Sequence, residues 1–442
     1  EQMAEGQQLW GSETSKAVDN FPVSGERVPI PVVRMLGRVK AAAARTNAEL
    51  GLLDDAVAER IAAAGDEIAA GEHDDQFPID VFQTGSGTSS NMNANEVIAE
   101  LAGDEAHAND HVNMGQSSND VFPSAVHLAA ASEATEKLLP ALEKLEHSFA
   151  AKADEWKDVV KAGRTHMMDA VPVTLGQEFA GYAAQARLGR ARVSDALPRA
   201  LQIPLGGTAT GTGLNTHAEF AERARTKLSE STGLAVAAPE DPFEAQGNRD
   251  GLVELSGALK VVAVSLTKIA NDLVIMGSGP RTGLVELSLP ELQKGSSIMP
   301  GKVNPVIPEV VLQVAAQVIG NDAAVTIAGT QGNFELNVRV PVIARNVLDS
   351  ITILSSAVTM LAEKCVDGLE AREDNLTRHA ESTPAIATAL NPHIGYDKAT
   401  EIVKEAVASE RTIREVAVEK GVDEATLDEA LDLRKMARGS AG

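Results

Sequence analysis

The segment 295–305, GSSIMPGKVNP, gathers the side chains in this sequence that most readily do chemistry. Within eleven residues it holds two serines, a lysine and an asparagine, together with two glycines and two prolines. So many turn-forming residues exclude a helix interior, although helical patterns flank the segment on both sides. We therefore predict a loop that presents hydroxyl, ammonium and amide groups to a ligand.

The glycine and lysine spacing of this loop does not fit a nucleotide-binding motif. Five residues rather than four separate Gly295 from Gly301, and Val303 stands where a hydroxyl side chain would bind magnesium. A dinucleotide-binding fingerprint is also disfavoured, because no strand pattern precedes any glycine cluster and the chain lacks a βαβ pattern. Nucleotide chemistry is therefore not expected.

His166 ends the sequence GRTH and is the second candidate for chemistry. A lone histidine is more often structural, and Thr165 could cap a helix here. Ser296, Lys302 and Glu309 strengthen the candidate, since Glu309 begins the next helical pattern and could orient a histidine. Together they suit removal of a proton next to a carboxylate. That reaction needs a base, an acid for the leaving group and fixed positive charge where the carboxylate gains a second negative charge.

Four further segments are rich in glycine, short hydroxyls and amides. Such groups hold carboxylates or phosphates at helix N-termini, although each segment alone could be an ordinary cap or turn. The segments are QTGSGTSSNMNANE (83–96), NDHVNMGQSSND (109–120), GRTHMMDAVPVT (163–174) and PLGGTATGTGLN (204–215).

His107 and His111 lie four residues apart with Asp110 between them. This spacing could place both rings on one side of a helical turn, but no HExxH glutamate accompanies them. Two interpretations stay open, a solvated surface turn and an anion-binding segment.

The composition describes a globular, acidic chain. No stretch of about 20 apolar residues runs without a charge, so we expect no membrane span. A net charge of −24 argues against nucleic acid. It fits either a surface suited to high salt or an ordinary acidic soluble protein. The single cysteine, Cys365, excludes a disulfide framework and a cysteine-based metal cluster. With no visible secretory signal, it predicts a cytoplasmic location.

Long helices must position these segments, because strand signals are weak and apolar residues recur at helical spacing. The stretches 252–276, 310–329 and 343–369 are apolar nearly all round, so they must be buried on several sides. We predict an all-α chain with a long central bundle that other subunits complete. The predicted domains are N-terminal helical 1–110, central bundle 111–365 and small C-terminal helical 366–442.

Taken together, the motifs resemble the fumarase/aspartase superfamily, and most closely its class II fumarate hydratases. The resemblance spans essentially the whole chain. It rests on TGSGTSSNMNANEV, NMGQSSNDVFPSAVHL, GRTHMMDAVPVTLGQE and GSSIMPGKVNP, and continues in LGGTATGTGLNTH, GNFELNV and ALNPHIGYDKATEI. It implies an all-α subunit of three domains whose central helices form the twenty-helix core of a homotetramer. It also implies active sites that are each built from three subunits.

The resemblance further implies roles for individual residues. Ser296 would be the base, while His166, oriented by Glu309, would serve the departing or incoming water. The residues that would hold the substrate carboxylates are Ser86, Thr88, Ser117, Ser118, Asn119, Thr165, Ser297, Lys302 and Asn304. The residues at the place of a second dicarboxylate site are His107, Asn109 and Asp110, with Ala108 replacing the usual proline. Neither a metal nor an organic cofactor is implied.

The implied reaction is the reversible hydration of fumarate to (S)-malate through an aci-carboxylate intermediate. Some positions resemble aspartate ammonia-lyases instead, notably LPELQKGSSIMP and Pro308 beside Glu309. Ser86, Ser118 and the sequence GNFELNV favour the hydratases. Aspartate ammonia-lyase activity therefore stays as the alternative. The expected partners are a small dicarboxylate and further copies of the chain, with neither nucleic acid nor a membrane.

Overall fold

The computed structural model describes residues 8–439, and helices make up most of them. Within this range the strands form only two-stranded ladders, which pair β1 with β2, β3 with β6 and β4 with β5. The predicted all-α class is confirmed.

The described residues divide into two compact units. The first comprises the chain up to Ala141 with Gly189–Val264 and Val314–Ser356, and the second comprises Leu142–Leu188, Ser265–Gln313 and the chain from Ala357 onward. Four long helices contribute residues to both units: α7 (Leu175–Ala200), α10 (Asp250–Met276), α11 (Val306–Gly329) and α12 (Val340–Lys364). The last three contain most of the stretches predicted to be long apolar helices. The predicted boundaries at 110 and 365 stay predictions.

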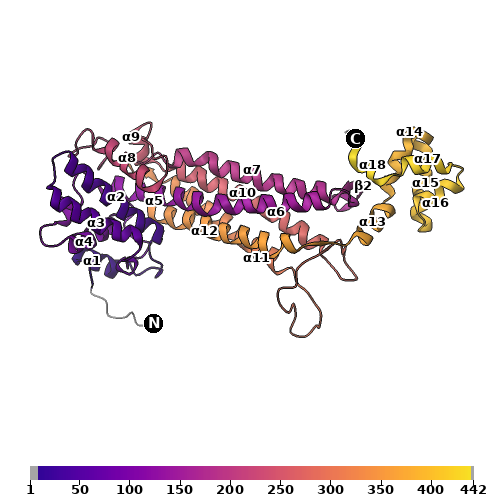
Figure 1. The fold of residues 1–442 in the computed structure, drawn as a ribbon, viewed down its shortest axis with the longest axis horizontal. Helices are drawn as coiled ribbons and strands as arrows, with labels where there is room; N and C mark the ends of the chain where they lie inside the picture. Colours follow the sequence, from indigo (N-terminus) through magenta and orange to yellow (C-terminus); the bar gives the residue numbers. More distant parts are fainter. Residues whose placement is uncertain (1–7, 440–442) are drawn as a thin grey trace. The chain divides into compact units, whose positions relative to one another are not determined.

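The first unit packs α2, α3, α4 and α5 against one another (Figure 1). Gly37 on α2 and Gly65 on α3 allow these two backbones to touch, because a Cβ on Gly37 would lie 2.5 Å from the carbonyl oxygen of Gly65. The elements of this unit are α1 (Ser12–Asn20), α2 (Ile30–Glu49), α3 (Asp55–Ala70), η1 (Asp74–Gln76), α4 (Thr88–Ala102), η2 (Ala108–Val112), α5 (Ser118–Glu133), η3 (Ala134–Leu138), α8 (Phe220–Thr232), α9 (Pro242–Gly247), β4 (Gly332–Asn333) and β5 (Leu336–Asn337).

The second unit joins a β-hairpin to helices and carries an aromatic cluster. The rings of Phe149, Phe179 and Tyr182 meet edge to face, with centroids 5.3–5.8 Å apart. Its elements before the C-terminal region are most of α6 (Leu139–Glu155), β1 (Val160–Thr165), β2 (Met168–Thr174) and β3 (Leu287–Ser288).

The C-terminal region from residue 366 has a small hydrophobic core of its own. Leu390, Ile402, Val416 and Leu427 lie fully buried in it. Its elements are η4 (Val366–Gly368), β6 (Glu370–Ala371), α13 (Glu373–Ser382), η5 (Pro384–Leu390), α14 (Asn391–Ile394), α15 (Tyr396–Ser409), α16 (Ile413–Glu419), α17 (Glu424–Ala430) and α18 (Leu433–Arg438).

Helix α11 and the segment Val340–Gly368 are long and apolar enough to cross a membrane by length and composition alone. Only 33% of the most apolar window of α11 is buried, against 61% for the second segment. Much of the apolar surface of α11 is therefore left uncovered by this chain.

Candidate active site

The loop 295–305 closes on itself at its neck. Asn304 donates its side-chain amide to the carbonyl oxygen of Gly295 at 2.5 Å. Gly295 fits there because a Cβ would lie 1.9 Å from the carbonyl oxygen of Lys302. Gly301 adopts a left-handed φ of +75°. The predicted loop is thus present, and backbone contacts between its two ends hold it.

Ser296 lies inside this loop and its hydroxyl oxygen accepts two backbone hydrogen bonds. The donors are the N–H groups of Ile298 at 3.2 Å and Met299 at 3.0 Å. Two donors aimed at one oxygen favour the negatively charged form of that oxygen. Lys302 and Ser297 are exposed beside it. The loop therefore fixes the hydroxyl oxygen of Ser296 as the acceptor of two backbone N–H groups.

His166 sits at the tip of the β1–β2 hairpin. Thr165 pairs with Met168 across the strands, and His166 and Met167 form the two-residue turn between them with φ of +56° and +61°. Two successive positive φ values define the turn type that matches the twist of paired strands, although Asn and Gly adopt it more easily. The hairpin places Thr165 and His166 in solvent at its end.

A buried charge cluster supports this hairpin. The carboxylate of Glu286, which is fully buried, lies 2.7 Å from Arg164 Nη2 and 3.4 Å from Lys161 Nζ, both on β1. His379 on α13 approaches the same carboxylate at 3.0 Å. Burial acts to raise the pKa of Glu286, but Arg164, Lys161 and His379 together hold it below its usual value. The cluster ties the strand that carries Thr165 to the segment leading into the loop 295–305.

Glu309 lies exposed on the first turn of α11. Within residues 8–439, no hydrogen bond or ion pair joins its carboxylate to His166. The predicted orientation of the histidine by this glutamate is therefore not formed within one chain.

In the first unit, the structure brings together the polar segments 83–96 and 109–120. Asn91 on α4 donates its side-chain amide to the hydroxyl of Ser118 at 2.9 Å. Ser86 and Thr88 share a hydrogen bond of 2.7 Å at the start of α4. Gly87 lies between them with φ of +76°, and a Cβ there would meet the ring of Phe122 on α5 at 2.1 Å. The N-terminal ends of α4 and α5 therefore form one polar surface, in which side chains cap the N–H groups of Ser89, Ser90 and Asn119.

Asp120 fixes the N-terminus of α5, and the sequence motifs alone did not single it out. Its carboxylate accepts hydrogen bonds from the backbone N–H groups of Ser117 at 2.9 Å, Gly206 at 2.9 Å and Thr208 at 3.0 Å. Burial raises the pKa of Asp120 to about 6, although these three donors and Lys40 oppose the shift. Asn119 adds a hydrogen bond to the carbonyl oxygen of Ala209 at 2.9 Å. The fourth polar segment, 204–215, is thereby held against the N-terminus of α5.

His107, Asn109 and Asp110 lie exposed around η2. His107 Nδ1 accepts the N–H of Asp110 at 3.1 Å, and His111 Nδ1 accepts the N–H of His107 at 3.0 Å. One nitrogen of each ring is thus engaged by the backbone. A cleft of about 440 Å³ between η2, α4 and the chain near Trp10 includes His107 in its lining.

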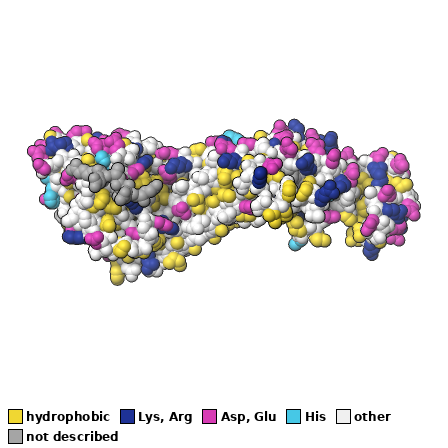
Figure 2. Space-filling view, turned by 90° about the horizontal axis from the view of Figure 1, so that it is seen from below, with side chains coloured by type: hydrophobic (Ala, Val, Ile, Leu, Met, Phe, Trp, Pro, Cys, Tyr) yellow, Lys and Arg dark blue, Asp and Glu magenta, His cyan; other side chains and the backbone are white. Residues whose placement is uncertain are grey.

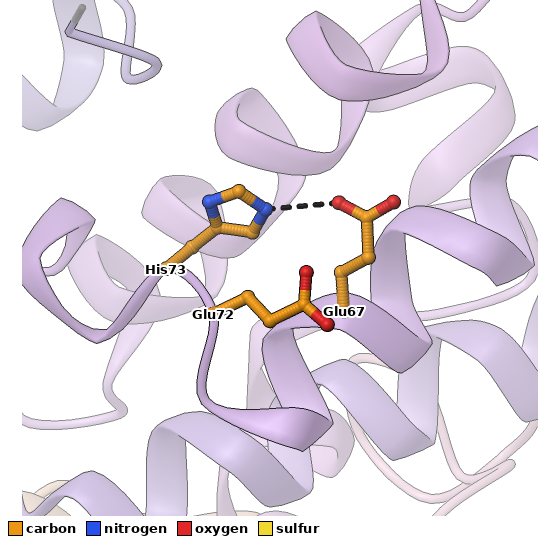
Figure 3. Close-up of side chains that lie close together, drawn as sticks. All are labelled: Glu67, Glu72 and His73. Carbon is orange, nitrogen blue, oxygen red and sulfur yellow. Dashed lines mark hydrogen bonds and ion pairs between the residues drawn. The ribbon is translucent and has the colours of Figure 1, made fainter. Parts of the chain in front are cut away.

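A separate cluster at the C-terminal end of α3 contains Glu67, Glu72 and His73, as Figure 3 shows. Their potential metal ligand atoms lie within 4.8 Å of one another. His73 Nε2 pairs with Glu67 Oε2 at 2.9 Å, while Glu72 is exposed. The ion pair explains the proximity, and none of the predicted motifs lies on α3.

Comparison with known proteins gives a consistent result over the whole chain. A family model described as Lyase matches residues 3–320, and a model described as Fumarase C C-terminus matches residues 386–438. The chain is 55% identical to fumarate hydratase class II of Corynebacterium efficiens, over 98% of this chain and 93% of the relative. It is 54% identical to fumarate hydratase class II of Mycobacterium tuberculosis, over 97% of this chain and 93% of the relative.

Solved structures agree with these relatives. A class II fumarase from Schistosoma mansoni superposes with a TM-score of 0.95 at 36% identity and covers 98% of this chain and 96% of its own. A fumarate lyase:delta crystallin from Brucella melitensis bound to cobalt gives a TM-score of 0.94 at 47% identity, covering 97% and 96%. The helical fold and the matched model define the chain as a lyase. Within that class it belongs to the class II fumarate hydratase family.

Proposed function

We propose that this chain catalyses the reversible hydration of fumarate to (S)-malate and is a carbon–oxygen lyase. The observation that carries the proposal is 55% identity over 98% of the chain to a class II fumarate hydratase. The closed loop 295–305 and the hairpin tip at His166 supply the groups that this reaction needs. Relatives at 51–55% identity are named fumarate hydratases, so aspartate ammonia-lyase activity is not favoured.

In the direction of malate dehydration, Ser296 first releases its hydroxyl proton to solvent, and the resulting alkoxide removes a proton from C3. The electron pair of the broken C–H bond moves into the adjacent carboxylate, which becomes an aci-carboxylate with two negative charges. Lys302, Asn304 and backbone N–H groups stabilise this charge. The C2–O bond then breaks, the double bond of fumarate forms, and the hydroxide leaves as water with a proton from His166. The hydrogen bonds from Ile298 and Met299 to Ser296 support its role as base.

The substrate carboxylates bind to short hydroxyls and amides at helix N-termini. The proposed ligands are Ser86, Thr88, Ser117, Ser118, Asn119, Thr165, Ser297, Lys302 and Asn304. The backbone N–H groups and helix dipoles at the starts of α4 and α5 favour anions there. We assign His107, Asn109 and Asp110 to a second dicarboxylate site beside the cleft at η2. Protein groups supply every step, so the mechanism uses no metal or organic cofactor.

The working form is a homotetramer whose active sites are each shared by three subunits. Two observations support it. Helix α11 exposes apolar side chains, with Ile319 41% and Ile327 60% exposed. No hydrogen bond or ion pair joins His166 to Glu309 within residues 8–439, which fits a site where a second copy supplies one of the two. A central bundle of twenty helices, five from each chain, would cover α10, α11 and α12.

We also propose a cytoplasmic location and an acidic surface that tolerates high salt. Acidic side chains are spread over the face in Figure 2, with basic ones between them. The net charge of −24 makes self-repulsion strongest at low ionic strength. The one cysteine, Cys365, is buried, and its pKa is raised by burial to about 12, which keeps it unreactive.

The decisive experiment offers purified protein (S)-malate and L-aspartate separately and follows the fumarate double bond in the ultraviolet. We expect malate to be converted at least about 100-fold faster than aspartate. Activity should survive dialysis against EDTA, since no step uses a metal. Fumarate formation from aspartate at the faster rate, or none from either substrate, would refute the proposal.

A further inference from the structure

Lys40 on α2 is a lysine with no exposed surface. Lysine is almost never fully buried unless it is paired with an opposite charge. Its ammonium instead donates to two neutral amide oxygens, Asn113 Oδ1 at 3.0 Å and Gln116 Oε1 at 2.9 Å. Among the ion pairs of the described residues, none includes Lys40. A charge buried without a partner is costly, so its retention calls for an explanation.

The side-chain amides of Asn113 and Gln116 connect Lys40 to the segment 117–119. Asn113 Oδ1 also accepts a hydrogen bond from Asn91 at 3.2 Å, and the same Asn91 amide donates to Ser118 Oγ at 2.9 Å. Asn113 donates in turn to the carbonyl oxygen of Gln116 at 3.2 Å. The ammonium is therefore the charged donor that both amides share, and the amides in turn contact the backbone directly ahead of Ser117.

The same contacts place a positive charge behind the N-terminus of α5. Asp120 on α5 is the charged group that acts on Lys40, and it favours the ammonium form. Burial nevertheless lowers the pKa of Lys40 to about 7. The dipole of α5 also favours an anion at this N-terminus, where Ser117, Ser118 and Asn119 lie.

We propose that Lys40 is a positioning residue that sets the affinity of this enzyme for its dicarboxylate. It acts through Asn113, Gln116 and Asn91 on the segment 117–119, which it never touches directly. The inference rests on the proposed function, in which that segment holds a substrate carboxylate.

The test compares Lys40→Met, Lys40→Gln and Lys40→Arg with the wild-type protein in fumarate hydration between pH 6 and pH 9. At pH 6 we expect KM to rise about tenfold in the Met and Gln variants while kcat changes by less than about threefold. The ratio of variant to wild-type KM should fall toward one by pH 9, because the wild-type lysine then loses its own charge. Arginine should retain most of the affinity.

Arg38→Gln is the matched control, because it removes one positive charge from the same helix at a side chain that donates to Ser231. Its KM should stay at the wild-type value.

Urea unfolding of every variant separates a structural role from a positioning role. Lower stability with an unchanged KM in the folded enzyme would overturn the inference, as would a KM ratio that does not vary with pH. Failure of all three variants to fold would equally overturn it, since the lysine would then serve folding. If the wild-type protein does not hydrate fumarate at all, the proposed function is the part that fails.

Discussion

Ser296 differs from a surface serine in what surrounds its oxygen. Hydrogen bonds from Ile298 and Met299 converge on Oγ, whereas the hydroxyl of the exposed Ser382 donates to the carbonyl oxygen of Arg378. Only the first arrangement stabilises an alkoxide. The turn of the loop at residues 296–299 causes this difference, because it directs two backbone N–H groups at the serine oxygen.

Ser296→Ala should lower kcat by about 10³-fold while the protein remains folded and assembled. The reason is the loss of the base that removes the C3 proton. Steady-state hydration of fumarate measures the change, and circular dichroism with size-exclusion chromatography checks the fold and assembly. Ser382→Ala, the control, should keep full activity. A Ser296→Ala enzyme within tenfold of the wild-type rate would assign the base elsewhere.

Asp120 is a structural counterpart to the groups proposed for catalysis. Its two oxygens accept three backbone N–H groups, one from Ser117 on the same turn and two from the distant segment 206–208. Asp120→Asn replaces one acceptor oxygen by a donor and leaves up to two of these buried N–H groups unpaired. We expect a loss of about 2–4 kcal/mol of unfolding free energy, measured by urea titration. Asp104→Asn, at an exposed turn, should change stability by less than about 0.5 kcal/mol. Equal stabilities would show that water replaces the lost acceptor.

Among the elements, the long helices were predictable because their apolar pattern continues for many turns. The stretches 252–276 and 310–329 lie within α10 and α11, which begin slightly earlier, at Asp250 and Val306. The hairpin β1–β2 was missed. Its turn is His166–Met167, which lacks the Asn–Gly signal that usually marks a two-residue turn.

The buried network at the start of α5 could not be predicted from the sequence either. Asp120 and Gly206 are 86 residues apart, and Lys40 and Gln116 are 76 apart. No local pattern reports such partners. The motif QSSND marked the binding segment, but the groups that hold it in place became visible only in the fold.

The shape of the loop 295–305 depends on Gly295, because there is no room for a side chain at this position. Gly295→Ala would drive a Cβ into the carbonyl oxygen of Lys302 and open the neck of the loop. We expect kcat to fall about 10²-fold, because Ser296 and Lys302 would be displaced by about 1 Å. The measurement is steady-state hydration of fumarate.

Gly301→Ala serves as the control for this loop, since no atom lies within 4 Å of its Cβ position and only the φ of +75° is unfavourable. It should cost about 1 kcal/mol of local strain and less activity than Gly295→Ala. A larger loss of activity in Gly301→Ala than in Gly295→Ala would mean that mobility at Gly301 matters more than closure at Gly295.

At the scale of the whole molecule, we expect the apolar surface of α11 to form the contact between subunits. Ile327→Asp places a charge on a side chain that is 60% exposed in the single chain. If this face is buried between subunits, an unpaired charge there will dissociate the tetramer and abolish activity, as sedimentation velocity would reveal. Val407→Asp on α15 is the control, because its side chain is equally 60% exposed but lies in the C-terminal region. A tetrameric Ile327→Asp protein would place the interface elsewhere.

The tip of the β1–β2 hairpin, at His166, is ordered before the substrate binds. Two successive left-handed residues leave the tip few alternative backbone shapes, and the ladder behind it is anchored by the buried carboxylate of Glu286. The backbone that carries His166 is therefore preorganised before a dicarboxylate arrives. The conformational entropy of ordering this tip has already been lost during folding, so it does not weaken the affinity for the substrate.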